Sequence, residues 1–384
     1  MRFEFATAGR IIFGPGAQEE LGTMAGELGQ RVLVVRGSNP ARSEALLGIL
    51  EAANLKYSCF EVHGEPTVEQ IAEGVNQARL AESDQVIGFG GGSVLDSAKA
   101  IAGLVTNPGA ILDYLEVIGK GKQLSIPALP CVAIPTTAGT GAEVTRNSVL
   151  ASPEHRVKVS LRSPFLLPRL AIVDPKLTSG LPSSITASTG LDALTQLIEP
   201  YVCIRANPAT DGYCLEGMHR VARSLRRACQ PGQDLQARED MALASLFGGL
   251  SLANAGLGAV HGFAAPIGGM FHAPHGAVCA ALLPHVMEAN CRAMEERLKE
   301  SAALRRYDTV AAILTGSEKA IALDGIRWIK ELCDELRIPN LGVYGVTETD
   351  IESLVEKAAK ASSMKANPIV LTNAELTTIL QAAL

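Results

Sequence analysis

The sequence predicts an α/β domain with a parallel sheet, followed by an all-helical domain. In the first half of the chain, short apolar runs rich in β-branched residues alternate with helical patterns. Such alternation is typical of a parallel sheet with helices on both faces. In the second half, apolar residues recur at helical spacing over long segments instead. We therefore place the α/β domain at about 1–183 and the helical domain at about 184–384.

Each expected element follows from its local pattern. In the first domain we expect strands at 31–37, 56–62, 85–91, 131–137, 156–161 and 170–174, with helices at 42–53, 67–81 and 93–105. Residues 2–14 alternate apolar with polar side chains and predict a hairpin of two strands ahead of the first strand–helix unit. In the second domain we expect helices at 185–203, 208–228, 235–254, 257–268, 275–296, 318–336, 348–361 and 373–383.

Composition excludes several classes of protein. With 47% hydrophobic and 19% charged residues, the 384-residue chain is rich enough in apolar side chains to form a large core. The net charge is −6, and no basic run with interleaved aromatics occurs, so nucleic acid is not an expected partner. The eight cysteines include no C-x-x-C pair, which favours reduced thiols in a cytoplasmic protein over a disulfide framework. The first residues lack the apolar run of a secretion signal.

A long uncharged segment lies in the second domain. No Asp, Glu, Lys or Arg occurs from Met241 to Met287, and the segment contains four histidines: His261, His272, His275 and His285. Gly, Pro and His interrupt it too often for a membrane-spanning helix, which needs about 20 predominantly apolar residues. We expect instead the buried centre of a helical domain. Buried histidines need polar partners there, because unsatisfied buried polar groups are costly.

Two glycine-rich or hydroxyl-rich loops follow strands of the first domain. The stretch "IGFGGGSVLDSAKAIA" (87–102) reads as strand, glycine turn and helix start, and "IPTTAGTGAEVT" (134–145) is a second loop after a strand. A helix N-terminus offers free N–H groups and partial positive charge to a phosphate. The glycine pattern is not G-x-G-x-x-G, so it is not the usual Rossmann fingerprint. Two such loops at one sheet edge nevertheless predict a dinucleotide site.

These motifs carry a family resemblance. "RIIFGPGAQEEL" (10–21), "GGGSVLDSAKAIA" (90–102), "IPTTAGTGAEVT" (134–145), "GLDALTQLIEPYV" (190–202) and "GLGAVHGFAAPIGGMFHAPHG" (256–276) occur in this order. Together they resemble the iron-containing (group III) alcohol dehydrogenase family over essentially the whole chain. The resemblance implies a dehydroquinate-synthase-like fold, an N-terminal dinucleotide-binding domain, and hydride transfer between NAD(P)(H) and a small alcohol, aldehyde or ketone. It also implies cofactor contacts from Gly91, Gly92, Ser93, Asp96, Thr136, Thr137, Thr140 and Lys158.

The resemblance further implies a metal site with two departures. Metal-dependent members of the family bind a divalent ion through one Asp and three His. Asp192, His261 and His275 match three of these ligands, but Gln196 occupies the first His position. An amide oxygen suits iron or zinc less well than imidazole does, so we expect Gln196 to be a weak or indirect ligand that weakens the site. A further family histidine that helps to relay protons is replaced by Ala265, and His272 is our candidate for that role.

Two alternatives to a metal-dependent enzyme stay open at this stage. A metal-free reductase of a keto acid, similar to maleylacetate reductases, would polarise the carbonyl with His261, His272 and His275. In that case Arg146 would bind the substrate carboxylate. The second alternative is a degenerate relative that binds nucleotide without turnover. Family resemblance and the open edge of the expected hairpin also favour a homodimer.

The expected cofactor preference rests on the end of the 31–37 strand. NAD-preferring members of the family have an Asp where this chain has Gly37, and Ser38 and Asn39 follow it. Removing a carboxylate there removes repulsion toward the 2′-phosphate of NADP, and Ser38, Asn39 and a nearby arginine can bind that phosphate. The sequence therefore predicts NADP(H) preference, or use of both cofactors.

Overall fold

The structure, a computed structural model, describes residues 2–232 and 234–384. The chain divides into two compact units. One, here called the α/β unit, comprises Ala6–Thr137 and Gly141–Gly180. The other, the helical unit, comprises Ala138–Thr140, Leu181–Leu384 and the N-terminal residues up to Phe5. The main boundary between the units therefore falls between Gly180 and Leu181. The sequence analysis placed the domain boundary three residues later, between 183 and 184.

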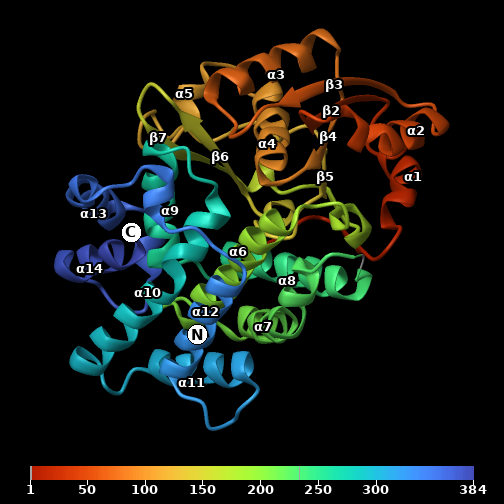
Figure 1. Cartoon of the computed structure of the whole chain (residues 1–384). Helices are drawn as coiled ribbons and strands as arrows, with labels where there is room; N and C mark the ends of the chain where they lie inside the picture. Colours follow the sequence, from red (N-terminus) through yellow and green to blue (C-terminus); the bar gives the residue numbers. More distant parts are fainter. Residues whose placement is uncertain (1, 233) are drawn as a thin grey trace. The chain divides into compact units, whose positions relative to one another are not determined.

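Among the described residues, a parallel sheet of six strands forms the centre of the α/β unit, in the order β1-β8-β5-β4-β2-β3 (Figure 1). The strands are β1 Ile11–Phe13, β2 Arg31–Gly37, β3 Lys56–Val62, β4 Gln85–Gly90, β5 Cys131–Pro135 and β8 Leu170–Val173. The helices between them are α1 Leu21–Gly26, α2 Glu44–Ala52, α3 Val68–Leu80, α4 Gly92–Thr106 and α5 Ile111–Tyr114. The predicted parallel α/β fold is confirmed.

Helices cover both faces of this sheet, as the strand sequences require. Along β2, Val32 and Val34 pack into one apolar cluster, with side chains from α1 and α2. Leu33 and Val35 pack into another cluster, with side chains from α3 and α4. Successive strand residues point to opposite faces, so a continuous apolar run such as 32–35 is buried on both.

The N-terminal hairpin expected from sequence does not form. Of residues 2–14, Ile11–Phe13 alone make a strand, which pairs in parallel with β8 at one edge of the sheet. The chain before it does not fold back on that strand: the Phe5 ring packs against Tyr213 of the helical unit, with ring centroids 6.0 Å apart. Tertiary packing of Phe5 therefore outweighs the local alternation. The homodimer inferred partly from that hairpin stays a prediction.

A two-stranded antiparallel sheet, missed by the sequence analysis, also belongs to the α/β unit. It comprises β6 Asn147–Ser152 and β7 Val157–Arg162, so the predicted 156–161 strand pairs with β6 rather than with the parallel sheet. Helix α4 supports β6 directly. Ser148 donates its hydroxyl to the carbonyl of Asp96 at 2.7 Å, and the Asp96 carboxylate accepts the Val149 N–H at 2.9 Å.

A buried lysine ties α4 to the loop after β5. Lys99 is fully buried, and its Nζ lies 2.9 Å from Asp96 Oδ1. It also donates to the Ala142 carbonyl at 2.9 Å and to the Thr145 hydroxyl at 3.0 Å. A buried ammonium is tolerated when it is paired and hydrogen-bonded in this way. Breaking one partner would leave the charge uncompensated.

Glu143 lies in the same loop, in the short 3-10 helix Ala142–Val144. Its side chain is 2% exposed, and burial raises the pKa of its carboxyl to about 7, against a partial lowering by Lys99. The folded protein therefore holds this proton more tightly than the unfolded chain does. Stability linked to Glu143 is fully present below pH 4.5, the ordinary value, and is lost as the pH rises to about 7.

We predict that Glu143→Gln reduces the loss of thermal stability between pH 5 and pH 8. The wild-type protein should lose up to roughly 3 kcal/mol of unfolding free energy over this window because of Glu143, and the neutral amide should not. Unfolding midpoints at several pH values measure the effect, with exposed Glu73→Gln of α3 as the control. Parallel pH profiles for wild type and Glu143→Gln would contradict the prediction.

Helices build the whole of the second unit from Leu181 onward. They are α6 Ser183–Val202, α7 Pro208–Cys229, α8 Leu235–Asn254, α9 Ala259–Met270, α10 His275–Arg297, α11 Ala302–Thr315, α12 Ala322–Glu335, α13 Ile351–Lys360 and α14 Asn373–Ala383. Helix α11 was not predicted. Helix α6 packs against α7, α8 and α10, and its residues from Gly190 to Val202 are buried throughout.

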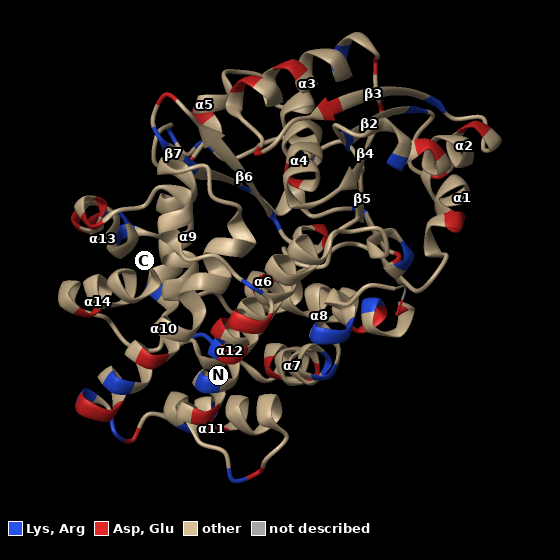
Figure 2. Cartoon of the chain, viewed as in Figure 1, with Lys and Arg blue, Asp and Glu red and all other residues tan. Residues whose placement is uncertain are grey.

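The uncharged segment coincides with the core of this unit. It covers most of α8, all of α9 and the first half of α10, and Figure 2 shows α9 without a charged residue. Among the described helices, no single one is both long and apolar enough to span a membrane. The α8–α9 pair passes that test by length and composition, but is bent by 97°.

Candidate metal centre

Three helices of the helical unit bring four potential ligands together. Asp192 comes from α6, His261 from α9, and His275 and Cys279 from α10. Asp192 Oδ1 lies 3.6 Å from His261 Nε2 and 3.7 Å from His275 Nε2. One ligand atom from each of the four residues lies within 4.8 Å of the others. The three ligands expected from sequence therefore converge, and Cys279 joins them.

Close helix packing determines where α10 begins. His275 is its first residue, and a Cβ atom added at Gly276 would lie 2.6 Å from the Ser188 carbonyl oxygen of α6. No other residue fits there without a shift of backbone. This close approach places the first turn of α10 beside α6, the helix that carries Asp192.

Glu199 of α6 orients His261. Its Oε2 lies 2.7 Å from His261 Nδ1, and its Oε1 accepts the Val260 N–H at 2.7 Å. The Asn367 side chain accepts the neighbouring Ala259 N–H at 3.1 Å, so both contacts satisfy the exposed start of α9. Because a carboxylate accepts only, Nδ1 must be the protonated nitrogen. Nε2 of the neutral ring is then free to act as a ligand on the Asp192 side.

The electrostatics of the cluster are those of a cation site. Burial works to raise the pKa of Asp192, but His275 and His261 hold it below its usual value. Burial works to lower the pKa of His261, yet the Cys279 sulfur and the Glu199 carboxylate raise it well above its usual value. The pKa of His275 is raised similarly, against burial, by Cys279 and Asp192. Protons on the imidazoles thus balance the buried carboxylate, a balance that a metal ion would provide instead.

Two buried oxygens in this region fit a cation. Asp192 Oδ1 and Gln196 Oε1 are both buried, and neither accepts a hydrogen bond from the described part of the chain. Buried oxygens without hydrogen-bond partners are costly, and a cation at Asp192 would satisfy its oxygen. Gln196 lies one turn after Asp192 on the same face of α6. A carboxylate and two imidazoles form a donor set that divalent iron or zinc accepts.

The other predicted catalytic residues, and the predicted cofactor contact Lys158, are not among the four clustered residues. His272 is exposed in the segment between α9 and α10, and is not one of the four clustered residues. Arg146 lies in the α/β unit, before β6. Lys158 of β7 belongs to the same unit, where it pairs with Glu65 at 3.1 Å. Their proposed roles stay predictions.

The two predicted nucleotide loops follow neighbouring parallel strands of the α/β unit. Gly91 precedes α4, and Gly92 and Ser93 form its first turn, which has no side-chain cap. Thr136 follows β5 and donates its N–H to the Gly90 carbonyl at 2.9 Å. A Cβ added at Gly91 would meet the Thr137 side chain at 3.4 Å. The uncapped start of α4 therefore lies beside the threonines, as an anion site requires. Thr140 is grouped with the helical unit, and Asp96 faces Lys99.

Gly37 ends β2, and the exposed Ser38 and Asn39 follow it. A Cβ added at Gly37 would meet no atom within 4 Å, so this position has open space. The neighbouring Arg36 donates to the Ser43 hydroxyl at 3.0 Å and to Glu61 at 2.9 Å. Asn39 accepts the Ala41 N–H at 3.2 Å. Ser38 and Asn39 are thus exposed at the end of β2, where a 2′-phosphate is expected to bind. Arg36, the arginine next to them, already pairs with Glu61.

Comparison with known proteins identifies the family. The iron-containing alcohol dehydrogenase model matches residues 8–175, and the C-terminal model of the Fe-containing alcohol dehydrogenase family matches residues 186–384. The chain belongs to the iron-containing alcohol dehydrogenase family. Its activity is therefore that of an oxidoreductase of the alcohol dehydrogenase type, as the sequence predicted.

Individual relatives support the assignment. The chain is 35% identical over 380 residues to alcohol dehydrogenase 4 of Saccharomyces cerevisiae, covering 97% of this chain and 96% of the relative. It is 33% identical over 381 residues to the NAD-dependent methanol dehydrogenase of Bacillus methanolicus, covering 97% of each. A solved structure of 1,3-propanediol oxidoreductase superposes with a TM-score of 0.91 and 34% identity over 100% of both chains.

Sequence reasoning missed two residues of this alcohol dehydrogenase site. Cys279 follows His275 by four residues, a spacing that places both side chains on one face of α10. Glu199 follows Asp192 by seven residues, two turns along the same face of α6. Both spacings are visible in the sequence. What the sequence lacks is the helix packing that brings these two faces together.

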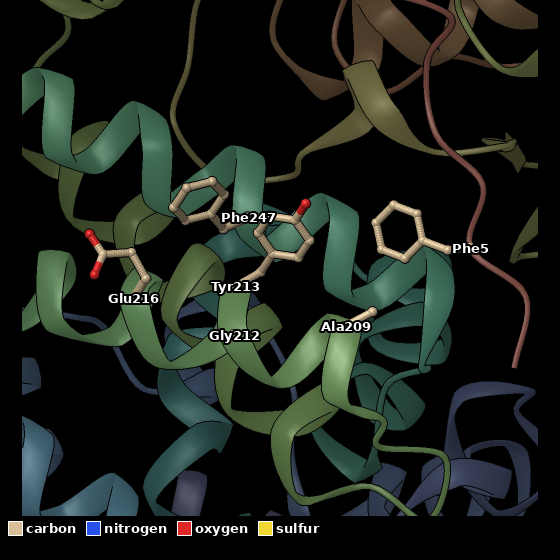
Figure 3. A pocket seen from close by; sticks show the side chains of 6 residues that line it. All are labelled: Phe5, Ala209, Gly212, Tyr213, Glu216 and Phe247. Atoms are coloured by element: carbon tan, nitrogen blue, oxygen red, sulfur yellow. The ribbon is translucent and has the colours of Figure 1, made fainter. Parts of the chain in front are cut away.

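The helical unit also has an apolar pocket of about 420 Å³, and none of the four clustered residues lines it. It is formed by Phe5, Ala209, Gly212, Tyr213, Glu216 and Phe247. Figure 3 shows the Tyr213 ring between Phe247 and Phe5, and the ring centroids of Tyr213 and Phe247 are 5.3 Å apart. Glu216 is already paired with Arg220 at 2.7 Å. The pocket offers no convergent polar groups for catalysis.

We predict that Glu199→Gln lowers zinc affinity about 10- to 100-fold, because the amide no longer holds His261 in the ligating tautomer. Competition with a chelator of known affinity measures this change, and circular dichroism reports whether the fold is retained. Glu352→Gln, at an exposed position on α13, is the control. Unchanged zinc affinity in folded Glu199→Gln protein would show that this carboxylate does not orient the ligand.

Proposed function

We propose that this protein catalyses reversible hydride transfer between a nicotinamide dinucleotide and a small, uncharged alcohol, aldehyde or ketone, assisted by a divalent metal ion. Asp192, His261 and His275 would hold the ion. The observation that carries the proposal is the convergence of the buried Asp192 Oδ1 with the Nε2 atoms of His261 and His275, at 3.6 and 3.7 Å, with no hydrogen bond to that oxygen from the described residues. Membership of the alcohol dehydrogenase family supports the same reaction.

The chemistry divides between the ion and the chain. When bound, a divalent ion supplies Lewis acidity that polarises the oxygen of an alcohol or carbonyl. The chain positions the ligands: Glu199 fixes the ring of His261, and the close contact of Gly276 with α6 places His275. Burial of Asp192 and His261 keeps water from competing at the ligand atoms. These rigid helical positions preorganise the site before substrate arrives.

The dinucleotide is proposed to bind to the α/β unit. The uncapped start of α4 at Gly91, Gly92 and Ser93 would receive the pyrophosphate, since its N–H groups and dipole attract anions. The Thr137 side chain lies beside Gly91 and would add a hydroxyl donor, and Thr136 lies next to Gly90 at the sheet edge, held by its backbone hydrogen bond. NAD use by the related methanol dehydrogenase supports a nicotinamide cofactor.

The relatives favour an uncharged substrate. Those compared above are named as alcohol, methanol and 1,3-propanediol enzymes, and these substrates carry no charge. The metal-free keto acid reductase considered from sequence gains no support from the family relatives. A degenerate relative that binds nucleotide without turnover would show no alcohol-dependent reduction of NAD(P)⁺.

We predict that removing metal with EDTA abolishes alcohol-dependent reduction of NAD(P)⁺ and that adding iron or zinc restores it. Asp192→Asn should lower kcat/KM at least about 100-fold, because several kcal/mol of Lewis-acid stabilisation is lost with the ion. The exposed Asp334→Asn of α12 is the control. Full activity in protein shown to be metal-free would reject the metal-assisted reaction, and no activity on a broad alcohol and aldehyde panel would favour the degenerate protein.

We also propose that NADP(H) is preferred or that both cofactors are used. The open space at Gly37 and the neighbouring Arg36, Ser38 and Asn39 support this proposal, because a 2′-phosphate needs room and donors. The Glu61 partner of Arg36 is 36% exposed, so the guanidinium can exchange partners without leaving a buried carboxylate unpaired.

We predict that Gly37→Asp shifts preference toward NADH. The new carboxylate fits the open space, and should lower kcat/KM for NADPH at least about tenfold relative to NADH through repulsion of the 2′-phosphate. Gly37→Ala is the control for the added Cβ alone. Steady-state kinetics with both cofactors decide: strong NADH preference in the wild-type enzyme would overturn the proposal.

A further inference from the structure

We infer that the thiolate of Cys279 is the fourth protein ligand of the metal ion, in place of the α6 histidine that Gln196 has replaced, and that the resulting site binds zinc. This inference rests on the metal-assisted reaction proposed above and specifies its ligand set. In the family pattern, two ligands spaced four residues apart lie on α6. Here such a pair, His275 and Cys279, lies on α10 instead.

The geometry places the Cys279 sulfur among the other ligands. Sγ lies 3.7 Å from His275 Nε2 and 3.9 Å from His261 Nε2. It also belongs, with Asp192, to the group whose ligand atoms lie within 4.8 Å of one another. Cys279 is fully buried, so its sulfur faces these groups rather than solvent.

Four of the distances between ligand atoms are close to those of tetrahedral coordination. Atoms bound about 2.0–2.3 Å from a central zinc ion at tetrahedral angles lie about 3.3–3.8 Å apart. The Asp192–His261, Asp192–His275 and Cys279–His275 distances are 3.6, 3.7 and 3.7 Å, and the Cys279–His261 distance is 3.9 Å. The remaining two separations, between the two imidazoles and between Asp192 and Cys279, are at most 4.8 Å, so side-chain adjustment would close the four atoms around one ion.

Donor chemistry favours Cys279 over Gln196. A thiolate is a strong anionic ligand that zinc binds at about 2.3 Å, whereas the Gln196 amide oxygen is neutral and suits zinc less well than sulfur or imidazole does. The Gln196 oxygen also lies near α8, where a Cβ added at Gly248 would be 3.5 Å from it.

The donor set determines the metal. Thiolate is a soft ligand and, with imidazole and one carboxylate, matches the sulfur, nitrogen and oxygen donors that zinc accepts. A Gln oxygen in the same position would instead leave a set of harder donors. The competing explanation is that Cys279 is an ordinary core thiol, since it packs within the apolar cluster of the helical unit.

X-ray absorption at the zinc edge of the zinc-loaded full-length protein separates the two explanations. We expect one sulfur neighbour at about 2.3 Å, besides nitrogen and oxygen neighbours at about 2.0–2.2 Å. Cys279→Ala should remove the sulfur neighbour, and Cys279→Ser should lower zinc affinity at least about tenfold. Cys291→Ala is the matched control, because Cys291 is another buried cysteine of α10 outside the cluster. Gln196→Ala should retain zinc and its sulfur neighbour.

Cobalt(II)-loaded protein gives a second readout, since a thiolate ligand produces a sulfur-to-metal charge-transfer band that Cys279→Ala should abolish. The wild-type spectra decide the matter even where a variant fails to fold. Bound zinc with nitrogen and oxygen neighbours alone would overturn the inference while leaving metal-assisted function intact. Activity in protein shown to hold no metal ion would overturn both.

Discussion

Glu199 is the contact on which the geometry of the metal centre depends. It lies two turns after Asp192 on the buried helix α6. Its carboxylate accepts one hydrogen bond from the Val260 N–H at the start of α9 and another from the Nδ1–H of His261. One carboxylate thus fixes where α9 begins and which imidazole nitrogen is left as a ligand. Because the carboxylate is buried, removing either partner leaves a charge that the core cannot solvate. Position and tautomer of His261 are therefore set by the fold before any ion binds.

The protein interior around this contact contains few charged side chains, so the electrostatics of the metal centre depend on the carboxylates of α6 and the histidines. Helix α9 and the first half of α10 carry no formally charged side chain, so the carboxylates of α6 and the histidines interact without competing ions from that segment. In such a poorly screened environment, the carboxylate must be balanced by protons on the imidazoles or by a metal ion. The orphaned Asp192 Oδ1 indicates that hydrogen bonds within the described chain do not complete this balance.

Features governed by local pattern were predictable from sequence, and those governed by packing were not. Continuous apolar runs such as that in β2 predicted a doubly covered parallel sheet, and the family resemblance of the motifs that contain Asp192, His261 and His275 implied that these residues would converge. The N-terminal hairpin failed because the Phe5 ring packs on Tyr213, a contact that no local alternation can reveal. Cys279 was overlooked because a cysteine in an apolar stretch is equally typical of a core thiol. Its proximity to His261 depends on how α9 and α10 pack.

The metal centre is built from three helices, α6, α9 and α10, and this has a consequence for how metal centres in this fold change their ligands. Asp192, His261 and His275 come from α6, α9 and α10, and position 196 of α6 and position 279 of α10 lie outside this set of three. If Cys279 is the fourth donor, as inferred above, changes at these two positions would exchange one donor type for another. If the cysteine arises first, the ion never loses its fourth ligand during the exchange. The three-helix junction thus provides a continuous evolutionary path between metal centres of different ligand softness.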